Sequence, residues 1–130
     1  FQNYPQIFKP YNRESAEFFF MEILNKSENT ALVANVNNKA VGYVLLMFIK
    51  YPENPFQNER TVLQLDQITV SENERNLGVG KKLINATINY AKSVNISQIE
   101  LNHWAKNNEA GIFFKKNGFE YYNNKMFLKV

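Results

Sequence analysis

Residues 107–119 read NNEAGIFFKKNGF, and this stretch decides the fold when it is taken together with residues 75–80, RNLGVG. In the later stretch, apolar residues at i, i+3 and i+4 predict a short helix over Asn108–Lys116, which Gly118 would end as a glycine C-cap. In the earlier stretch, a strand ending at Val70 passes through a polar turn and two glycines into a helix. The two stretches therefore predict two helices that each follow a strand.

The glycine-rich turn has the features of an anion site. A strand that enters a helix through glycines exposes backbone N–H groups at the helix start, where the positive end of the helix dipole also lies. Gly78 and Gly80 let the backbone approach an anion without an intervening Cβ. Arg75 and Lys81 add positive charge on either side. The spacing matches neither the Walker loop nor the dinucleotide fingerprint, and a tight turn would also explain the glycines. Alone, the turn predicts only a site for phosphate.

The remaining elements complete a mixed domain. Asn37-Asn38 is a turn signal between two apolar strands, which predicts a hairpin. The expected elements are, in chain order, a loop over residues 1–11, a helix capped by Ser15 over 16–24, strands over 31–36 and 40–49, a loop over 51–61, a strand over 62–70, a helix from Gly80, a strand over 98–104, the helix over 108–116 and a closing hairpin of 119–122 and 125–130. This order predicts an α/β or α+β domain around one mixed sheet.

Composition argues against several classes of protein. The chain has 130 residues, the size of one domain. It has no cysteine and a single histidine, His103, which argues against disulfides, thiolate or histidine-rich metal sites and a Ser-His-Asp triad, and fits a cytoplasmic protein. No stretch is long and apolar enough to suggest a membrane partner. The net charge of +3 mildly favours anionic ligands, but the lysines are dispersed, so we do not expect a nucleic-acid partner.

The two stretches together resemble the GNAT family of N-acetyltransferases. The coenzyme loop of that family, Q/R-x-x-G-x-G/A, is matched by Arg75, Gly78 and Gly80. Its later motif, N-x-x-A-x-x-F-Y-x-x-x-G-F, is matched by Asn107, Ala110, Phe113, Gly118 and Phe119. The resemblance covers roughly residues 31–130. It implies a mixed, mostly antiparallel, splayed β-sheet flanked by helices, and a single acyl-CoA N-acyltransferase domain over residues 1–130.

By this resemblance, acetyl-coenzyme A would lie in the wedge between the strand that ends at Val70 and the next strand of the sheet. Backbone groups of Ile68, Thr69 and Val70 would hold the pantetheine arm like an added strand. Asn107 and Phe113 would flank the other side. The pyrophosphate would be held by the loop residues, which are Arg75, Asn76, Leu77, Gly78, Val79, Gly80 and Lys81. We expect no metal.

Several positions bear on the chemistry. Phe114 occupies the place where many family members carry a tyrosine that is proposed to protonate the departing coenzyme A thiolate. Because phenylalanine cannot donate a proton, either another group serves, such as Tyr121 or Tyr122, or the thiolate leaves without a dedicated acid. Asp66 lies where several members carry a glutamate thought to deprotonate the amine through water; it is either that base or a structural aspartate. His103 faces either the cleft or the core.

The resulting hypothesis is an enzyme that moves an acetyl group from acetyl-coenzyme A to a primary amine of a small molecule or peptide. Since the chain has no cysteine for an acyl-enzyme, the expected route is direct attack in a ternary complex. The alternative is a non-catalytic CoA-binding module of the same fold. The start leaves little room for the usual first strand and helix of the family. Either the chain is a trimmed fragment, or a neighbouring copy supplies the strand in a homodimer.

Overall fold

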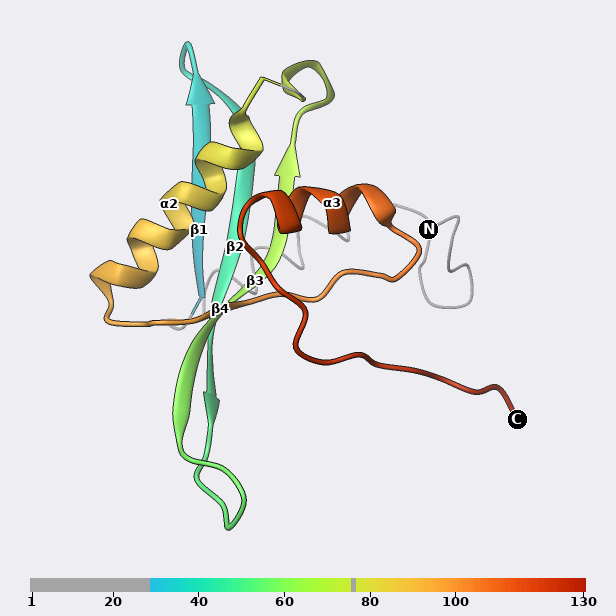
Figure 1. Cartoon of the computed structure of the whole chain (residues 1–130). Helices are drawn as coiled ribbons and strands as arrows, with labels where there is room; N and C mark the ends of the chain where they lie inside the picture. The colour runs from blue at the N-terminus through green and yellow to red at the C-terminus, as the bar shows by residue number, and fades with distance from the viewer. Residues whose placement is uncertain (1–28, 76) are drawn as a thin grey trace.

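The computed structural model describes residues 29–75 and 77–130. The loop expected over residues 1–11 and the helix expected over residues 16–24 therefore lie outside the described residues. Figure 1 shows α2 and α3 on the same face of the sheet. The elements in chain order are β1 (Asn29–Val36), β2 (Lys39–Tyr51), β3 (Arg60–Val70), a 3-10 helix η1 (Glu72–Glu74), α2 (Val79–Ser93), β4 (Ile99–Glu100) and α3 (Asn108–Lys116).

In the described part of the chain, the strands form a four-stranded sheet in the order β1-β2-β3-β4. β1, β2 and β3 pair antiparallel, and β4 pairs parallel with β3. The first hairpin turns at Asn37 and Asn38, whose φ angles of 52° and 65° lie in the left-handed region that asparagine tolerates. The predicted fold class, an α+β domain with a mixed and mostly antiparallel sheet, is confirmed.

β3 and β4 lie side by side only where they begin. β3 pairs with β2 along its length, whereas its pairing with β4 is limited to Leu63 with Ile99 and Gln64 with Glu100. The strand expected over residues 98–104 is therefore a two-residue ladder followed by an irregular segment, because the chain turns away from β3 after Glu100. The predicted splay of the sheet is confirmed.

The core lies between α2 and the sheet. The buried residues of α2 are Val79, Leu83, Ile84, Thr87 and Ala91. They pack with sheet residues that include Val44, Leu46 and Leu63. The hydroxyl of Thr87 donates to the carbonyl oxygen of Leu83 at 2.8 Å, so this buried polar group is satisfied within the helix. The helical period read from the sequence is confirmed, with the helix beginning at Val79 rather than Gly80.

The C-terminal segment differs from the expectation. The sequence predicts a closing hairpin of residues 119–122 and 125–130, but neither stretch forms a strand in the described chain. A strand needs a neighbour that offers its backbone N–H and C=O groups, and this segment leaves the sheet (Figure 1). Phe127 and Leu128 are accordingly 78% and 86% exposed. The hairpin prediction is wrong for this structure.

Gly42 lies where β2, β3 and α2 approach one another. A Cβ at this position would lie 2.8 Å from the carbonyl oxygen of Thr69 and 3.2 Å from Leu83 Cδ1. We expect Gly42→Ala to lower the free energy of unfolding by about 1–3 kcal/mol, because backbone must shift to admit the methyl group. Urea denaturation measures this. Ala40→Val adds methyl groups at an exposed position of the same strand and should change stability little; an equal loss in both variants would contradict the close-contact explanation.

Candidate functional site

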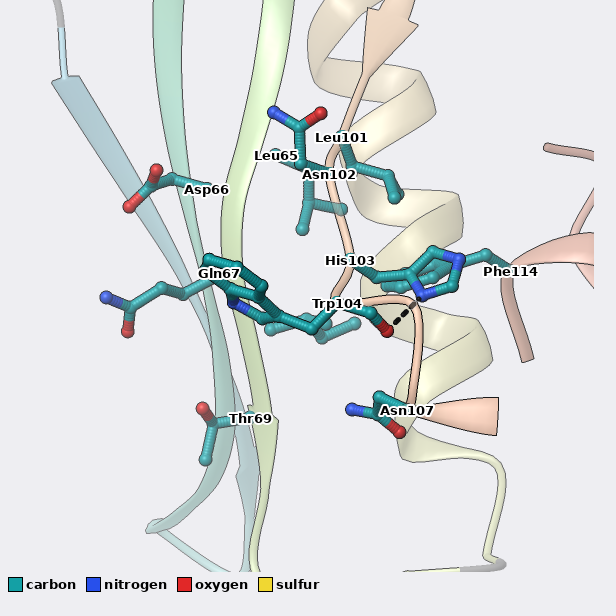
Figure 2. A pocket seen from close by; sticks show the side chains of 11 residues that line it. Leu65, Asp66, Gln67, Thr69, Leu101, Asn102, His103, Trp104, Asn107 and Phe114 are labelled. Carbon is teal, nitrogen blue, oxygen red and sulfur yellow. Dashed lines mark hydrogen bonds between the residues drawn. The ribbon is translucent and has the colours of Figure 1, made fainter. Parts of the chain in front are cut away.

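The splayed strands enclose a cavity of about 280 Å³, which we call the cleft. Its walls are β3 on one side and the segment after β4 on the other, as Figure 2 shows. The lining residues are Leu65, Asp66, Gln67, Ile68 and Thr69 from β3, Leu101, Asn102, His103, Trp104 and Asn107 from the segment after β4, and Phe114 from α3. The cleft therefore brings together side chains that are separated by about half of the described chain.

A β-bulge at Asp66 shapes the β3 wall. In the pairing with β2, Leu45 is opposite Gln67 and Leu46 is opposite Leu65, which leaves Asp66 as the extra residue. The bulge reverses the alternation read from the sequence, which placed Asp66 within an apolar run. Asp66 is instead exposed. In the view of Figure 2, the side chains of Asp66, Gln67 and Thr69 leave β3 on the side away from the segment that carries His103.

The cleft edge of β3 has no strand partner in the described chain beyond Gln64. Ile68 and Thr69, two of the residues predicted to hold a pantetheine arm, line the cleft along this edge. Val70, the third, does not line it. Its carbonyl oxygen lies 3.4 Å from Arg75 Nε, which ties the end of the strand to the loop that follows. An unpaired strand edge can accept an extended chain through its N–H and C=O groups.

The glycine loop leads from β3 into α2. Gly78 is the N-cap of α2 with a φ of +82°, a conformation that strains any L-residue with a Cβ. The first turn closes with the Lys82 N–H donating to the Gly78 carbonyl oxygen at 3.1 Å. By helix geometry, the N–H groups of residues 79–81 therefore point out of the helix end. This end can accept an anion.

The predicted loop residues occupy different environments. Leu77 is 66% exposed, and Lys81 is also exposed. Val79 is buried in the core, so only its backbone can face a ligand. Asn76 lies outside the described residues. The basic side chains of the loop are thus accessible, whereas the side chain of Val79 anchors the helix start.

α3 is held against the loop by Phe113. A Cβ on Gly80 would lie 3.0 Å from Cε1 and Cζ of the Phe113 ring, so this position is tight for anything larger than glycine. Phe113 does not line the cleft. Asn107, predicted with it, does line the cleft and also caps α3, since its Oδ1 accepts the Ala110 N–H at 3.2 Å. Of the two residues predicted to flank the cofactor, Asn107 lies on the cleft and Phe113 lies against the glycine loop.

His103 lies on the cleft beside Phe114. Phe114 is 8% exposed and packs edge-on against Phe113, with the ring centroids 5.4 Å apart. The rings of His103 and Phe114 are 6.3 Å apart, and His103 Nε2 lies 2.6 Å from the Tyr121 hydroxyl. Tyr122 points elsewhere and donates to Glu100. Of the two tyrosines considered from the sequence, only Tyr121 contacts a residue that lines the cleft.

A hydrogen-bond network around Glu100 lies where β3 and β4 separate, and sequence reasoning missed it. Arg60 Nη1 donates to Glu100 Oε2 at 2.9 Å, and the guanidinium carbon Cζ of Arg60 lies over the Tyr51 ring, 4.1 Å from its centroid. Gln98 and Tyr122 donate to the same oxygen at 2.7 Å and 2.5 Å, and Tyr51 donates to Oε1 at 3.2 Å. Burial acts to raise the pKa of Glu100, but the hydrogen bonds, led by that from Tyr122, hold it below its ordinary value of 4.5.

The Glu100 network should make stability depend on pH. Because the folded pKa is lowered, the ionised carboxylate stabilises the fold above pH 4.5, and this contribution is lost as the pH falls through the lower folded value. At neutral pH, we expect the free energy of unfolding to be lower for Glu100→Gln than for the wild type. The gap between the two free energies should become smaller in acid. Urea denaturation over a pH series measures this. Glu120→Gln removes an exposed carboxylate and should leave the pH dependence of the free energy of unfolding as in the wild type. If Glu100→Gln is less stable than the wild type by the same amount at every pH, the Glu100 carboxylate does not have a lowered pKa in the fold.

Sequence reasoning also missed part of the cleft lining. Asn102 and Trp104 alternate with Leu101 and His103 along the segment after β4, and all four line the cleft. The sequence shows the order of these residues. Which of their side chains face β3 depends on how the segment after β4 diverges from β3. Gln67 reaches the wall because of the bulge, and its Oε1 accepts the Tyr43 hydroxyl at 3.1 Å.

Residues 29–75 and 77–130 contain no group of three His, Asp or Glu side chains that could hold a metal ion. No helix within these ranges is long and apolar enough to cross a membrane. The residues around the cleft and the loop do fit an elongated anion with a flexible arm, because an open strand edge leads directly to a positive helix end.

Comparison with known proteins agrees with the geometry. A family model described as the acetyltransferase (GNAT) family matches residues 2–119. An uncharacterized N-acetyltransferase of Methanocaldococcus jannaschii is 33% identical over 107 residues, which are 81% of this chain and 45% of that protein, so the chain spans less than half of this relative. A crystal structure of a tetramutant protein from Bacillus halodurans has a TM-score of 0.87 at 22% identity, covering 99% of this chain and 83% of that chain. An aminoglycoside N-acetyltransferase in complex with CoA has a TM-score of 0.73 at 20% identity, covering 90% and 87%. The chain belongs to the acetyltransferase (GNAT) family.

Proposed function

We propose that this protein transfers an acetyl group from acetyl-coenzyme A to a primary amine. The observation that carries the proposal is the continuity of the open β3 edge with the glycine loop. Ile68 and Thr69 line the cleft, and the chain then passes through Arg75 to the exposed N–H groups that follow Gly78. Family membership supports the activity, and a family neighbour of the same fold is known in complex with CoA.

Acetyl-coenzyme A supplies the activated acetyl group when it is bound. The edge of β3 at Ile68 and Thr69 would hold its pantetheine arm by backbone hydrogen bonds. The loop N–H groups and the exposed side chain of Lys81 would hold its pyrophosphate. Because Asn107 Oδ1 accepts the Ala110 N–H in the α3 cap, its Nδ2 remains as a donor toward the cleft. These roles require no movement of the core residue Val79.

Asp66 would accept the proton that the attacking amine loses. Asp66 lines the cleft at the bulge, and its exposed side chain projects to the side of β3 away from the segment that carries His103 (Figure 2). An exposed carboxylate beside the cleft is accessible to an amine, which favours the base. The amine would attack directly, since the chain has no cysteine to carry an acyl group.

The acceptor would approach from the side of β3 that carries Asp66, Gln67 and Thr69. These side chains are polar and project away from the segment that carries His103 (Figure 2). Structural neighbours include N-acetyltransferases that act on aminoglycosides. A small molecule with several amino and hydroxyl groups is therefore the first class of acceptor to test, ahead of peptides.

The activity is tested by following thiol release from acetyl-coenzyme A with amino sugars, polyamines, amino acids and N-terminal peptides. Release that depends on one class of amine, with the acetylated amine found by mass spectrometry, supports the proposal. Tight CoA binding measured by calorimetry without release for any amine would favour the non-catalytic binding module. Failure to bind CoA would overturn both. The same measurements test whether the chain, as one unit, is sufficient for activity.

A further inference from the structure

We propose that His103, positioned by Tyr121, is the proton donor of the cleft and takes the place of the tyrosine that is missing at Phe114. The proposal rests on the acetyl transfer proposed above and assigns the group that protonates the departing sulfur. Three observations support it. His103 lines the cleft, it makes a short hydrogen bond to Tyr121, and Phe114 beside it cannot donate a proton.

The hydrogen bonds fix the tautomer of His103. Nδ1 lies 3.1 Å from the carbonyl oxygen of Trp104, which can only accept, so Nδ1 carries the proton. Nε2 is then the unprotonated nitrogen, and the Tyr121 hydroxyl donates to it at 2.6 Å. Figure 2 shows Nδ1 turned toward the Trp104 carbonyl at the cleft. The imidazole thus holds its Nδ1 proton against the Trp104 carbonyl at the cleft wall, and its Nε2 accepts from Tyr121 on the opposite side of the ring.

The pair is tightly held by its surroundings. A Cβ on Gly111 would lie 3.1 Å from the Tyr121 hydroxyl oxygen and 3.2 Å from His103 Cε1, so α3 approaches the hydrogen bond at the one position that has no side chain. The His103 and Tyr121 rings are 5.6 Å apart. Lys115 Nζ lies over the Tyr121 ring, 5.1 Å from its centroid, which adds a cation–π contact to the pair.

Tyr122 does not compete for this role. Its hydroxyl is engaged with the Glu100 carboxylate, outside the cleft. Tyr121 is itself 57% exposed and does not line the cleft, so it acts through His103 and is a positioning residue. Phe114 lies beside His103 on the cleft wall, so a donor at either position would serve the same region.

The amine nitrogen forms a bond to the thioester carbonyl carbon, the carbon–sulfur bond breaks, and its electron pair stays on sulfur. The Nδ1 proton of His103 leaves its hydrogen bond to the Trp104 carbonyl and passes to that sulfur, while Nε2 takes the proton of the Tyr121 hydroxyl. Because Tyr121 is 57% exposed, its hydroxyl would regain a proton from solvent. The proton released by the amine goes to Asp66 and then to solvent.

The test compares variants that each remove one group, and it uses both turnover and CoA binding. Tyr121→Phe deletes one hydroxyl, and Tyr122→Phe is the matched control. His103→Gln removes the titratable ring. We expect kcat to fall about 100-fold in His103→Gln and about 10-fold in Tyr121→Phe, with the KM for acetyl-coenzyme A unchanged. Tyr122→Phe should keep the wild-type kcat.

Two further readouts separate a proton donor from a structural residue. The pKa of the CoA thiol in the binary complex, followed by thiolate absorbance, should be lower in the wild type than in His103→Gln, because the Nδ1 proton stabilises the thiolate. Phe114→Tyr in the His103→Gln background should restore part of the kcat, because it places a phenol beside the lost donor. Thermal denaturation identifies any variant that fails to fold, and in that case Tyr121→Phe carries the test.

The inference is overturned if wild-type protein releases thiol and Tyr121→Phe and His103→Gln do so at the same rate. That result would leave the proposed function intact and mean that the thiolate leaves without a dedicated acid. Equal losses in Tyr121→Phe and Tyr122→Phe would also overturn it, by pointing to the anchoring of the C-terminal segment. Wild-type protein that neither binds CoA nor releases thiol would instead overturn the function on which the inference rests.

Discussion

Replacing Gly78 by aspartate is expected to abolish CoA binding. Gly78 has a φ of +82° and ends the loop at the start of α2, where the N–H groups of the first turn are exposed. A carboxylate there would oppose the pyrophosphate, and juxtaposed like charges cost several kcal/mol, so we expect the Kd for CoA to rise at least about 100-fold. The left-handed conformation would cost about a further 1–2 kcal/mol of stability. Isothermal calorimetry with CoA measures the binding.

Gly118 provides a matched control for this variant. It too has a positive φ, +94°, and a Cβ at either glycine would meet no atom within 4 Å, so Gly118→Asp introduces the same charge and a similar backbone strain. Gly118 follows α3 and is far along the chain from the loop. Gly118→Asp should lose comparable stability yet bind CoA. Normal CoA binding by Gly78→Asp would show that the loop does not hold the pyrophosphate.

Asp66→Asn is expected to lower kcat about 100-fold or more, because general base catalysis contributes at least this factor in most enzymes. The substitution keeps the size and polarity of an exposed side chain at the bulge, so it should leave the fold and the KM for acetyl-coenzyme A unchanged. Steady-state thiol release at saturating acetyl-coenzyme A measures kcat. The loss should be smallest at high pH, where more of the amine is already neutral.

Asp66→Glu is the control for the chemistry at this position. It keeps the carboxylate one methylene farther from the backbone, so it should retain much more activity than Asp66→Asn. If Asp66→Asn has the wild-type kcat at every pH, Asp66 takes no part in proton transfer. If both variants lose activity together with the affinity for acetyl-coenzyme A, the bulge rather than the carboxylate is important.

The parts of the site that follow from local chemistry were predictable. Gly78 needs a positive φ and Asn37 and Asn38 form a left-handed turn, and these residue types indicate such conformations directly. The apolar face of α2 followed from its period. The order of the elements and the two motifs were then enough to identify the splayed sheet and its fold class.

The parts that depend on how distant segments meet were not predictable. The bulge that exposes Asp66 is a property of the pairing between β2 and β3 and leaves no local mark in the sequence. The His103–Tyr121 hydrogen bond joins residues that are 18 positions apart and depends on the path of the chain after α3. The closing hairpin failed for a similar reason, since the residue types of 119–122 and 125–130 are compatible with strands but do not show that a partner strand is available.

Glu100 joins β3 and β4 at the point from which the walls of the cleft diverge. It is the last residue of β4 that pairs with β3, and its carboxylate binds side chains from β3, from β2 and from the C-terminal segment. The Arg60–Glu100 ion pair links the two strands directly, and neither residue lines the cleft. Exchanging this pair could therefore change how far the cleft opens, and so the width of the ligand that it admits, while every residue that lines the cleft stays the same.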